Sequence, residues 1–199
     1  MSGNFSLIIK NGSCFIEGKL KNIDIGLSGN KIKKIGKIDL NSAKVFDASN
    51  KIVLPGVIDT QVHFREPGST DTEDLESGSK AAVLGGITSV FEMPNTNPPT
   101  STLAEFDKKI KLAKNRMHSN YAFYFGATPE NSDQLSKLKN LDGCCGVKLF
   151  AGSSTGKLLV DKESDIEKVI SKSDRIVSIH SEDEEILKLR KIRNNFKKI

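Results

Sequence analysis

The spacing of apolar residues along the chain changes near residue 55. Before that point, short runs rich in Ile and Val are separated by Asn-Gly and Gly-Asn pairs, a pattern that predicts strands joined by tight turns. The runs are "SLIIKNGSCFIEG" at 6–18, "DIGLSGNKIKKIG" at 24–36 and "AKVFDASNKIVLPG" at 43–56. We therefore expect residues 1–54 to form a strand-rich unit.

From residue 55 onward, strand-like and helix-like stretches alternate. Strands are predicted at 56–64, 87–93, 120–127, 143–150 and 175–180, and helices at 72–86, 101–117, 131–140, 161–172 and 181–196. Strict alternation of this kind is typical of right-handed βαβ units that build a parallel sheet. The pattern predicts five such units.

Two α/β architectures accommodate five units. A (β/α)8 barrel takes about 250 residues, or roughly 31 for each unit, so residues 55–199 would supply just under five of the eight. An open doubly wound sheet would place a Gly-rich phosphate-binding turn after its first strand, whereas this first strand ends in His63, Arg65 and a Pro-Gly pair. We therefore expect a partial TIM-like barrel over residues 55–199 that stops after its fifth unit.

Composition and cysteine usage narrow the class of protein. Hydrophobic residues make up 37% of the chain and charged residues 28%, which is ordinary for a soluble globular protein. The N-terminus has no basic segment of a signal peptide, and no apolar run is long enough to cross a membrane. The three cysteines lack disulfide or zinc-knuckle spacing. We expect a cytoplasmic protein without a membrane partner.

The net charge of +5 comes from the end of the chain. The last twelve residues hold six Lys or Arg and no acid, and without them 24 basic residues stand against 25 acidic ones. Neither an aromatic nor a Gly-rich pattern accompanies this basic segment, so it predicts the solvated face of a helix. We expect no nucleic-acid partner.

Candidate chemistry lies where predicted strands end, because the working groups of a barrel gather at the C-terminal ends of its strands. His63, Lys148 and His180 each lie at or near such an end, 85 and 32 residues apart, close to three units and one unit. All three are therefore expected to face one mouth of the barrel. One strand-end His is most often structural, and Lys148 alone fits a lysine that extends its amine to solvent; the shared register favours a site.

Four stretches of the chain resemble the dihydroorotases, metal-dependent cyclic amidohydrolases of the amidohydrolase superfamily. They are "PGVIDTQVHFREPG", "GGITSVFEMPNTNPPT", "GVKLFAGSSTG" and "IHSEDE". The joint presence of "HFREP" and "MPNT" makes the chain more similar to dihydroorotases than to hydantoinases. The resemblance covers the whole chain, including its N-terminus. It implies that residues 1–54 form a segment of a small composite β-sandwich.

The resemblance implies a zinc site with one or two ions. The first strand of the family carries D-x-H-x-H, in which His63 matches the second His and Gln61 replaces the first. Alternate strand residues share a face, so Gln61 and His63 are expected to point at one metal position, although Gln is a weaker zinc ligand than His. Lys148 matches a lysine that carbon dioxide converts to a carbamate bridging two zinc ions, and His180 matches a ligand of the second zinc.

The resemblance also implies a substrate and a reaction. Arg65 matches an arginine that binds the substrate carboxylate, a pairing that suits the planar guanidinium, and Asn95 matches a second group on that carboxylate. Without the resemblance, Asn95 fits a turn residue before "TNPP" almost as well. The implied enzyme is a zinc-dependent hydrolase of C–N bonds in cyclic amides. It would interconvert L-dihydroorotate and N-carbamoyl-L-aspartate in de novo pyrimidine biosynthesis.

The same resemblance places the general-base Asp beyond residue 199, so no catalytic residue is expected within this chain. We accordingly expect the chain alone to be inactive, and its open sheet edges to favour a homo-oligomer. Two alternatives stay open. One is a non-catalytic dihydroorotase-like partner of aspartate carbamoyltransferase, which Gln61 favours; the other is a hydantoinase-like cyclic amidase.

Overall fold

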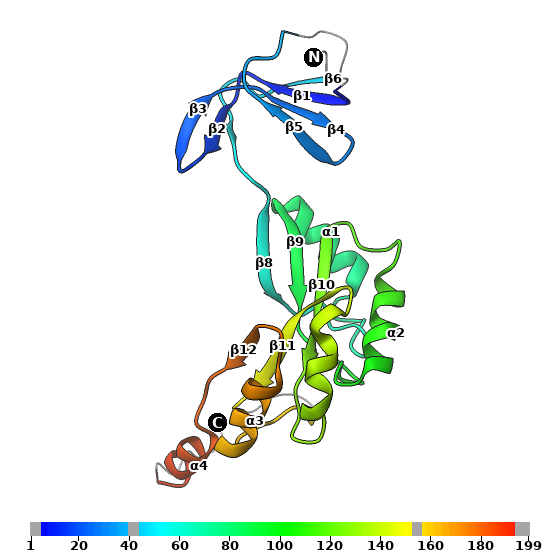
Figure 1. The fold of residues 1–199 in the computed structure, drawn as a ribbon, viewed down its shortest axis with the longest axis vertical. Helices are drawn as coiled ribbons and strands as arrows, with labels where there is room; N and C mark the ends of the chain where they lie inside the picture. The colour runs from blue at the N-terminus through cyan, green and yellow to red at the C-terminus, as the bar shows by residue number, and fades with distance from the viewer. Residues whose placement is uncertain (1–4, 40–43, 153–156, 194–199) are drawn as a thin grey trace. The chain divides into compact units, whose positions relative to one another are not determined.

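The computed structural model describes residues 5–39, 44–152 and 157–193. The chain divides into two compact units, Met1–Pro55 and Gly56–Ile199, which are described separately (Figure 1). The end of the last predicted helix, at 194–196, lies outside the described residues.

The first unit consists of short strands in two sheets. Within its described residues, one sheet has the order β5-β4-β1-β6 and the other the order β3-β2-β7. The strands are β1 (Leu7–Lys10), β2 (Ser13–Ile16), β3 (Lys19–Asn22), β4 (Ile25–Ser28), β5 (Lys31–Ile35), β6 (Lys44–Asp47) and β7 (Ile52–Val53). Ile8 and Ile25 of the first sheet and Cys14 of the second are buried, so each sheet contributes apolar side chains to the interior.

The second unit is built on a curled parallel sheet with the order β12-β11-β10-β9-β8 among the described residues (Figure 1). Its strands are β8 (Val57–Val62), β9 (Ile87–Glu92), β10 (Asn120–Gly126), β11 (Cys144–Phe150) and β12 (Val177–His180). Each strand pairs with the next one along the chain, as in a barrel, and no strand order reversal occurs within this sheet. The expectation of a partial TIM-like barrel is confirmed, and the doubly wound alternative is not.

Helices cover one face of this sheet. They are α1 (Leu75–Leu84), α2 (Leu103–Ala113), the 3₁₀ helix η1 (Ser132–Asn140) and α3 (Glu163–Lys172). The last helix, α4 (Glu184–Arg193), follows β12, and its residues Ile186, Leu189 and Ile192 are exposed. Phe106 of α2 and Leu135 of η1 belong to the same buried cluster as Phe123 and Phe125 of β10. Alternate residues of a strand share a face, so the neighbours of Phe123 and Phe125 in β10 point to the other face. That other face is the concave side of the curl.

One predicted helix has a different form. The stretch expected as a short α-helix at 131–140 is the 3₁₀ helix η1. Its two fully buried leucines, Leu135 and Leu138, are three residues apart. Three residues complete one turn of a 3₁₀ helix, so both leucines point into the core from one side. The apolar spacing of three was the signal for this form.

The described residues contain no helix that combines the length and apolar character needed to cross a membrane.

Candidate functional site

The "HFREPG" loop follows β8 and presents Arg65 between two buried neighbours. Phe64 is buried, and its ring lies so close to Gly78 of α1 that a Cβ at Gly78 would be 2.4 Å from the ring. Arg65 itself has a left-handed backbone, with φ of 59°. A non-glycine residue in that region costs of order 1–3 kcal/mol and persists only when its surroundings impose it. The packing of Phe64 against α1 is one of two anchors that hold Arg65 in this backbone conformation.

Glu66 is the second anchor of this loop. Its carboxylate is buried and accepts a hydrogen bond from the backbone N–H of Leu75 at 2.9 Å, where α1 begins. Nη1 and Nη2 of Arg116 donate to its two oxygens at 2.7 and 3.1 Å. Bidentate guanidinium–carboxylate pairing is strong and directional. Glu66 therefore ties the loop to the start of α1 and to the segment after α2.

A second loop, which follows β9, lies directly against the first. The N–H of Met93 donates to the carbonyl of Val62 at 2.9 Å, and the N–H of Asn97 donates to the carbonyl of Pro67 at 2.9 Å. Gly68 has φ of 123°, and a Cβ there would lie 2.9 Å from Cβ of Asn97. Only glycine accommodates both this positive φ and so close an approach of Asn97. The two loops therefore form one wall.

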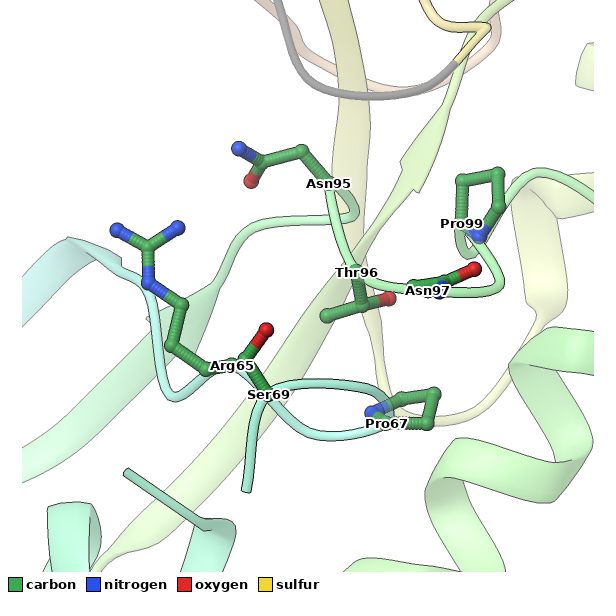
Figure 2. Close-up of a pocket in the computed structure, with 7 residues that line it drawn as sticks. All are labelled: Arg65, Pro67, Ser69, Asn95, Thr96, Asn97 and Pro99. Carbon is green, nitrogen blue, oxygen red and sulfur yellow. The ribbon is translucent and has the colours of Figure 1, made fainter. Parts of the chain in front are cut away.

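These loops enclose a pocket of about 420 Å³. Figure 2 shows the guanidinium of Arg65 and the amide of Asn95 directed to the same side of this pocket. Both groups carry N–H donors, and the first is cationic, so this side of the pocket suits an anion. Its lining residues are Arg65, Pro67, Ser69, Asn95, Thr96, Asn97 and Pro99.

His63 is bonded to the second loop. Its Nδ1 lies 2.9 Å from Oδ1 of Asn95. An amide oxygen only accepts, so Nδ1 must carry the proton and a neutral ring then keeps its lone pair on Nε2. Burial lowers the pKa of His63, and the positive charge of Arg65 lowers it further; the bond to Asn95 acts in the opposite direction, and Lys148 and Lys109 also lower it. His63 is therefore held in the form that can bind a metal.

Lys148 is a buried lysine on the concave face of the sheet. Only 3% of it is exposed, and its Nζ lies 5.0 Å from the centre of the Phe150 ring. Burial lowers its pKa because a desolvated ammonium is disfavoured. The charge of Lys148 also acts on His63, so the structure brings these two predicted ligands near one another. A lysine that extends to solvent, the alternative interpretation, does not agree with this burial.

His180 ends β12 and lies on the same face as Lys148. Phe150 pairs with His180 in the register, and Lys148 pairs with Ser178, two residues earlier on each strand and so on the same face. The rings of Phe150 and His180 have centroids 6.0 Å apart. Nε2 of His180 is 3.3 Å from a carboxylate oxygen of Glu182, and 42% of its side chain is exposed. This contact leaves Nδ1 as the nitrogen that faces away from Glu182.

Gln61 lies on β8 and is exposed. Its backbone N–H donates to the side chain of Asp59 at 2.9 Å. The pairing of β8 with β9 is irregular between Asp59 and Val62, which weakens the simple alternation that placed Gln61 and His63 on one face. A shared metal position for Gln61 and His63 stays a prediction.

The chemistry of the predicted donors suits zinc in their deprotonated forms. Imidazole nitrogens and carboxylate oxygens are both zinc ligands, and the lowered pKa values of His63 and Lys148 favour a neutral ring and a neutral amine. An ammonium does not suit a cation, whereas a carbamate on Lys148 is a carboxylate and does. Within the described residues, no three His, Cys, Asp or Glu side chains converge as a metal site. The metal and the carbamate stay predictions.

Sequence reasoning missed two charge pairs beside the pocket. One is the half-buried pair of Glu66 with Arg116, and the other is the fully buried pair of Glu92 at the end of β9 with Lys109 of α2. A signal for the second pair was present: Lys109 occupies an apolar position of its helix, three residues after the buried Phe106, and Glu92 is the last residue of a largely apolar strand. A charge at a core position indicates a buried partner.

The curled parallel sheet, with its candidate residues at the strand ends, defines a class, the proteins built on a (β/α) barrel. Residues 52–191 match the amidohydrolase family, and the chain belongs to that family. In structure it is similar to an L-hydantoinase from Arthrobacter aurescens, with a TM-score of 0.87 and 28% identity, over 98% of this chain and 45% of the other.

Curated relatives include two kinds of enzyme. The chain is 34% identical to the dihydroorotase of Thermococcus kodakarensis over 182 residues, which is 91% of this chain and 42% of that protein. It is 37% identical to the dihydroorotase of Methanosarcina acetivorans over 183 residues, 89% of this chain and 39% of that one. An allantoinase of Escherichia coli is 40% identical over 152 residues, 75% of this chain and 33% of that protein. The chain thus spans about two fifths of the length of these dihydroorotases.

Proposed function

We propose that the chain carries the substrate-carboxylate part and part of the metal site of a dihydroorotase. The observation that carries the proposal is the placement of Arg65 and Asn95 on one pocket beside His63. L-Dihydroorotate has a carboxylate on its ring, and a guanidinium binds a carboxylate through two parallel hydrogen bonds. Dihydroorotase relatives that align with about 90% of this chain support the same substrate.

The roles of the residues follow from their contacts. Arg65 would bind the substrate carboxylate, and the amide nitrogen of Asn95 would donate to it. Oδ1 of Asn95 accepts from His63, so one side chain would orient both the substrate and a metal ligand. His63, Lys148 as a carbamate and His180 would hold zinc, with Gln61 beside them.

Zinc, when bound, would polarise the ring amide and lower the pKa of a water molecule. In the hydrolytic direction, water adds across the C–N bond of the cyclic amide and gives N-carbamoyl-L-aspartate, a step of pyrimidine synthesis. The chain's own residues would fix the ring by its carboxylate, so that the amide lies towards His63 and Lys148. Positioning of this kind accounts for a large part of many catalytic rate enhancements.

A cyclic amidase without a carboxylate-bearing substrate is the second candidate. The likeness to a hydantoinase structure and to an allantoinase sequence favours it. Hydantoins and dihydropyrimidines have a cyclic amide but lack the ring carboxylate of dihydroorotate. The two candidates therefore make opposite statements about Arg65, which dominates substrate binding in the first and is dispensable in the second.

The test compares two ligands that differ in one group. Dihydrouracil is the ring of dihydroorotate without its carboxylate. Calorimetry on the purified chain, with zinc and bicarbonate, should give measurable binding of L-dihydroorotate and far weaker binding of dihydrouracil. Arg65→Met should weaken dihydroorotate about 10- to 100-fold, the value of a hydrogen bond to a charged group, and leave dihydrouracil unchanged.

Equal affinity for the two ligands, or an Arg65→Met chain that binds dihydroorotate as the wild type does, would favour the amidase. Ultraviolet loss of dihydroorotate, followed in the same buffer, measures turnover. Binding without turnover agrees with the expected inactivity of this chain and with a non-catalytic partner of aspartate carbamoyltransferase. The homo-oligomer, the carbamoyltransferase partner and the cytoplasmic location stay predictions.

A further inference from the structure

A buried pair of opposite charges lies behind the two loops of the pocket. Glu92 is the last residue of β9, Lys109 lies in the middle of α2, and each side chain is 1% exposed. Nζ of Lys109 contacts the Glu92 carboxylate and lies 5.3 Å from the centre of the Phe123 ring. The pair therefore lies in the layer between the sheet and α2, outside the pocket itself.

Lys109 is bonded to one loop, and Glu92 lies near the other. Nζ of Lys109 donates to the carbonyl of Met93 at 3.2 Å and to the hydroxyl of Thr100 at 3.3 Å. Met93 and Thr100 flank the loop that carries Asn95. The backbone of Phe64, the residue next to Arg65 in the other loop, lies near enough to the Glu92 carboxylate to lower its pKa. One buried pair thus lies against the backbones that carry the two anion-binding side chains.

Stability alone does not account for this pair. Burial raises the pKa of Glu92 to about 7 and lowers that of Lys109, so both charges are disfavoured where they lie. Apolar residues of similar volume commonly replace a buried ion pair with no loss of stability. What apolar residues would not supply is the two directional bonds from Lys109 to Met93 and Thr100.

We propose that Glu92 and Lys109 are positioning residues that set the distance and orientation between Arg65 and Asn95. The inference rests on the proposed function, because the aligned pair of side chains is expected to bind the dihydroorotate carboxylate. Neither Glu92 nor Lys109 lines the pocket, so both act through the loops. Removing the pair should leave the pocket chemically intact and its two donors misaligned.

The test uses the double variant E92Q/K109M, which removes both charges and nearly conserves both volumes. The single variant K109M is a poor test, because an unpaired buried carboxylate would destabilise the whole fold. The control is V169A, which leaves a cavity at a buried position of α3 in the same hydrophobic core. Denaturant unfolding establishes that both variants fold cooperatively and how much stability each has lost.

Two measurements then judge the proposal. Dihydroorotate should bind E92Q/K109M at least about tenfold more weakly than wild type, since small misplacements of binding groups are costly, whereas V169A should bind as wild type does. Amide hydrogen exchange should be faster at Met93 and Asn97 in E92Q/K109M, because these N–H groups bond the end of β8 and the loop that follows it. In V169A these two amides should keep wild-type exchange.

Wild-type affinity together with wild-type exchange at Met93 and Asn97 in E92Q/K109M would overturn the proposal. If the wild-type chain does not bind dihydroorotate, the proposed function fails, and hydrogen exchange alone decides the positioning role. Should E92Q/K109M not fold, the same measurements on E92L/K109M, in which apolar side chains replace both members of the pair, decide it: unchanged affinity and unchanged exchange at Met93 and Asn97 overturn it there too.

Discussion

Nδ1 of His63 and Oδ1 of Asn95 are 2.9 Å apart and come from loops that follow two neighbouring strands. The contact makes a predicted substrate-binding residue the hydrogen-bond acceptor of a predicted metal ligand. Such partners fix the tautomer and the ring orientation of a ligating His. A change at Asn95 is therefore expected to alter two properties, the protonation of His63 and the binding of an anion.

The variant Asn95→Asp tests whether Asn95 is a partner of His63 or only a turn residue. A carboxylate next to His63 should raise the pKa of that ring by about one to three pH units, and it should repel the carboxylate of dihydroorotate. NMR titration of the histidine ring protons measures the pKa, with His63→Asn used to assign the signal among the three histidines. A His63 pKa that does not move in Asn95→Asp would show that the contact is not maintained in solution.

Because Phe64 packs on Gly78, adding a single methyl group at residue 78 should destabilise the fold. In Gly78→Ala the new Cβ would lie 2.4 Å from the Phe64 ring, so the ring must move. Overpacking of this kind typically costs about 1–3 kcal/mol, and it should also displace Arg65 and weaken dihydroorotate binding. Gly85→Ala, at the end of the same helix, meets its nearest atom at 3.4 Å and is the matched control. Equal unfolding midpoints for the two variants would contradict the prediction.

The sequence predicted the order of the elements well, because apolar periodicity records which residues face a core. It also placed His63, Arg65, Asn95 and Lys148 at strand ends, and the geometry of a parallel sheet brings such ends together. The contact between the two loops was not predictable in this way. The bond from Asn97 to Pro67 and the approach at Gly68 depend on tertiary distances that no local pattern carries.

Other features failed to be predicted for a related reason. The partner of a buried charge is set by packing between elements, so the pairing of Lys109 with Glu92 was out of reach although the buried lysine left a signal. The same holds for Glu182, which contacts His180 but was predicted only to lie at the start of the helix at 181–196. Residue type and spacing predict a site's location better than its supporting contacts.

The N-cap of α1 should make the stability of the protein fall at acid pH. Asp74 is the N-cap of α1, and bonds from the backbone and side chain of Ser77 lower the pKa of its carboxyl. A lowered folded-state pKa stabilises the protein above the unfolded value near 3.8, and this contribution is lost as the pH falls through the folded value. The melting temperature of Asp74→Ala should therefore lie below that of wild type at pH 7, and the difference between the two melting temperatures should shrink near pH 3.

Asp74→Ser is the control for this prediction, because serine caps a helix without titrating. The melting temperature of Asp74→Ser should be close to that of wild type at pH 7. At pH 3 it should still lie above that of Asp74→Ala. A gap between wild type and Asp74→Ala that is the same at both pH values would contradict the role of the ionised carboxyl.

Bicarbonate should strengthen zinc binding through Lys148. The ammonium of a lysine repels a cation, whereas the neutral amine reacts with carbon dioxide to form a carbamate, which is an anionic oxygen ligand of the kind zinc accepts. Burial lowers the pKa of Lys148 and so raises the fraction of reactive amine. Competition with a fluorescent chelator should give zinc affinity at least about tenfold higher in bicarbonate than in buffer depleted of carbon dioxide, since even the loss of a group that only supports a metal ligand typically costs about 10- to 100-fold.

Lys148→Met should bind zinc weakly in both buffers, and Lys172→Met, which removes an exposed lysine of α3, should respond to bicarbonate as wild type does. Zinc affinity that is independent of bicarbonate in the wild-type chain, or a bicarbonate response that survives in Lys148→Met, would rule out the carbamate as a ligand.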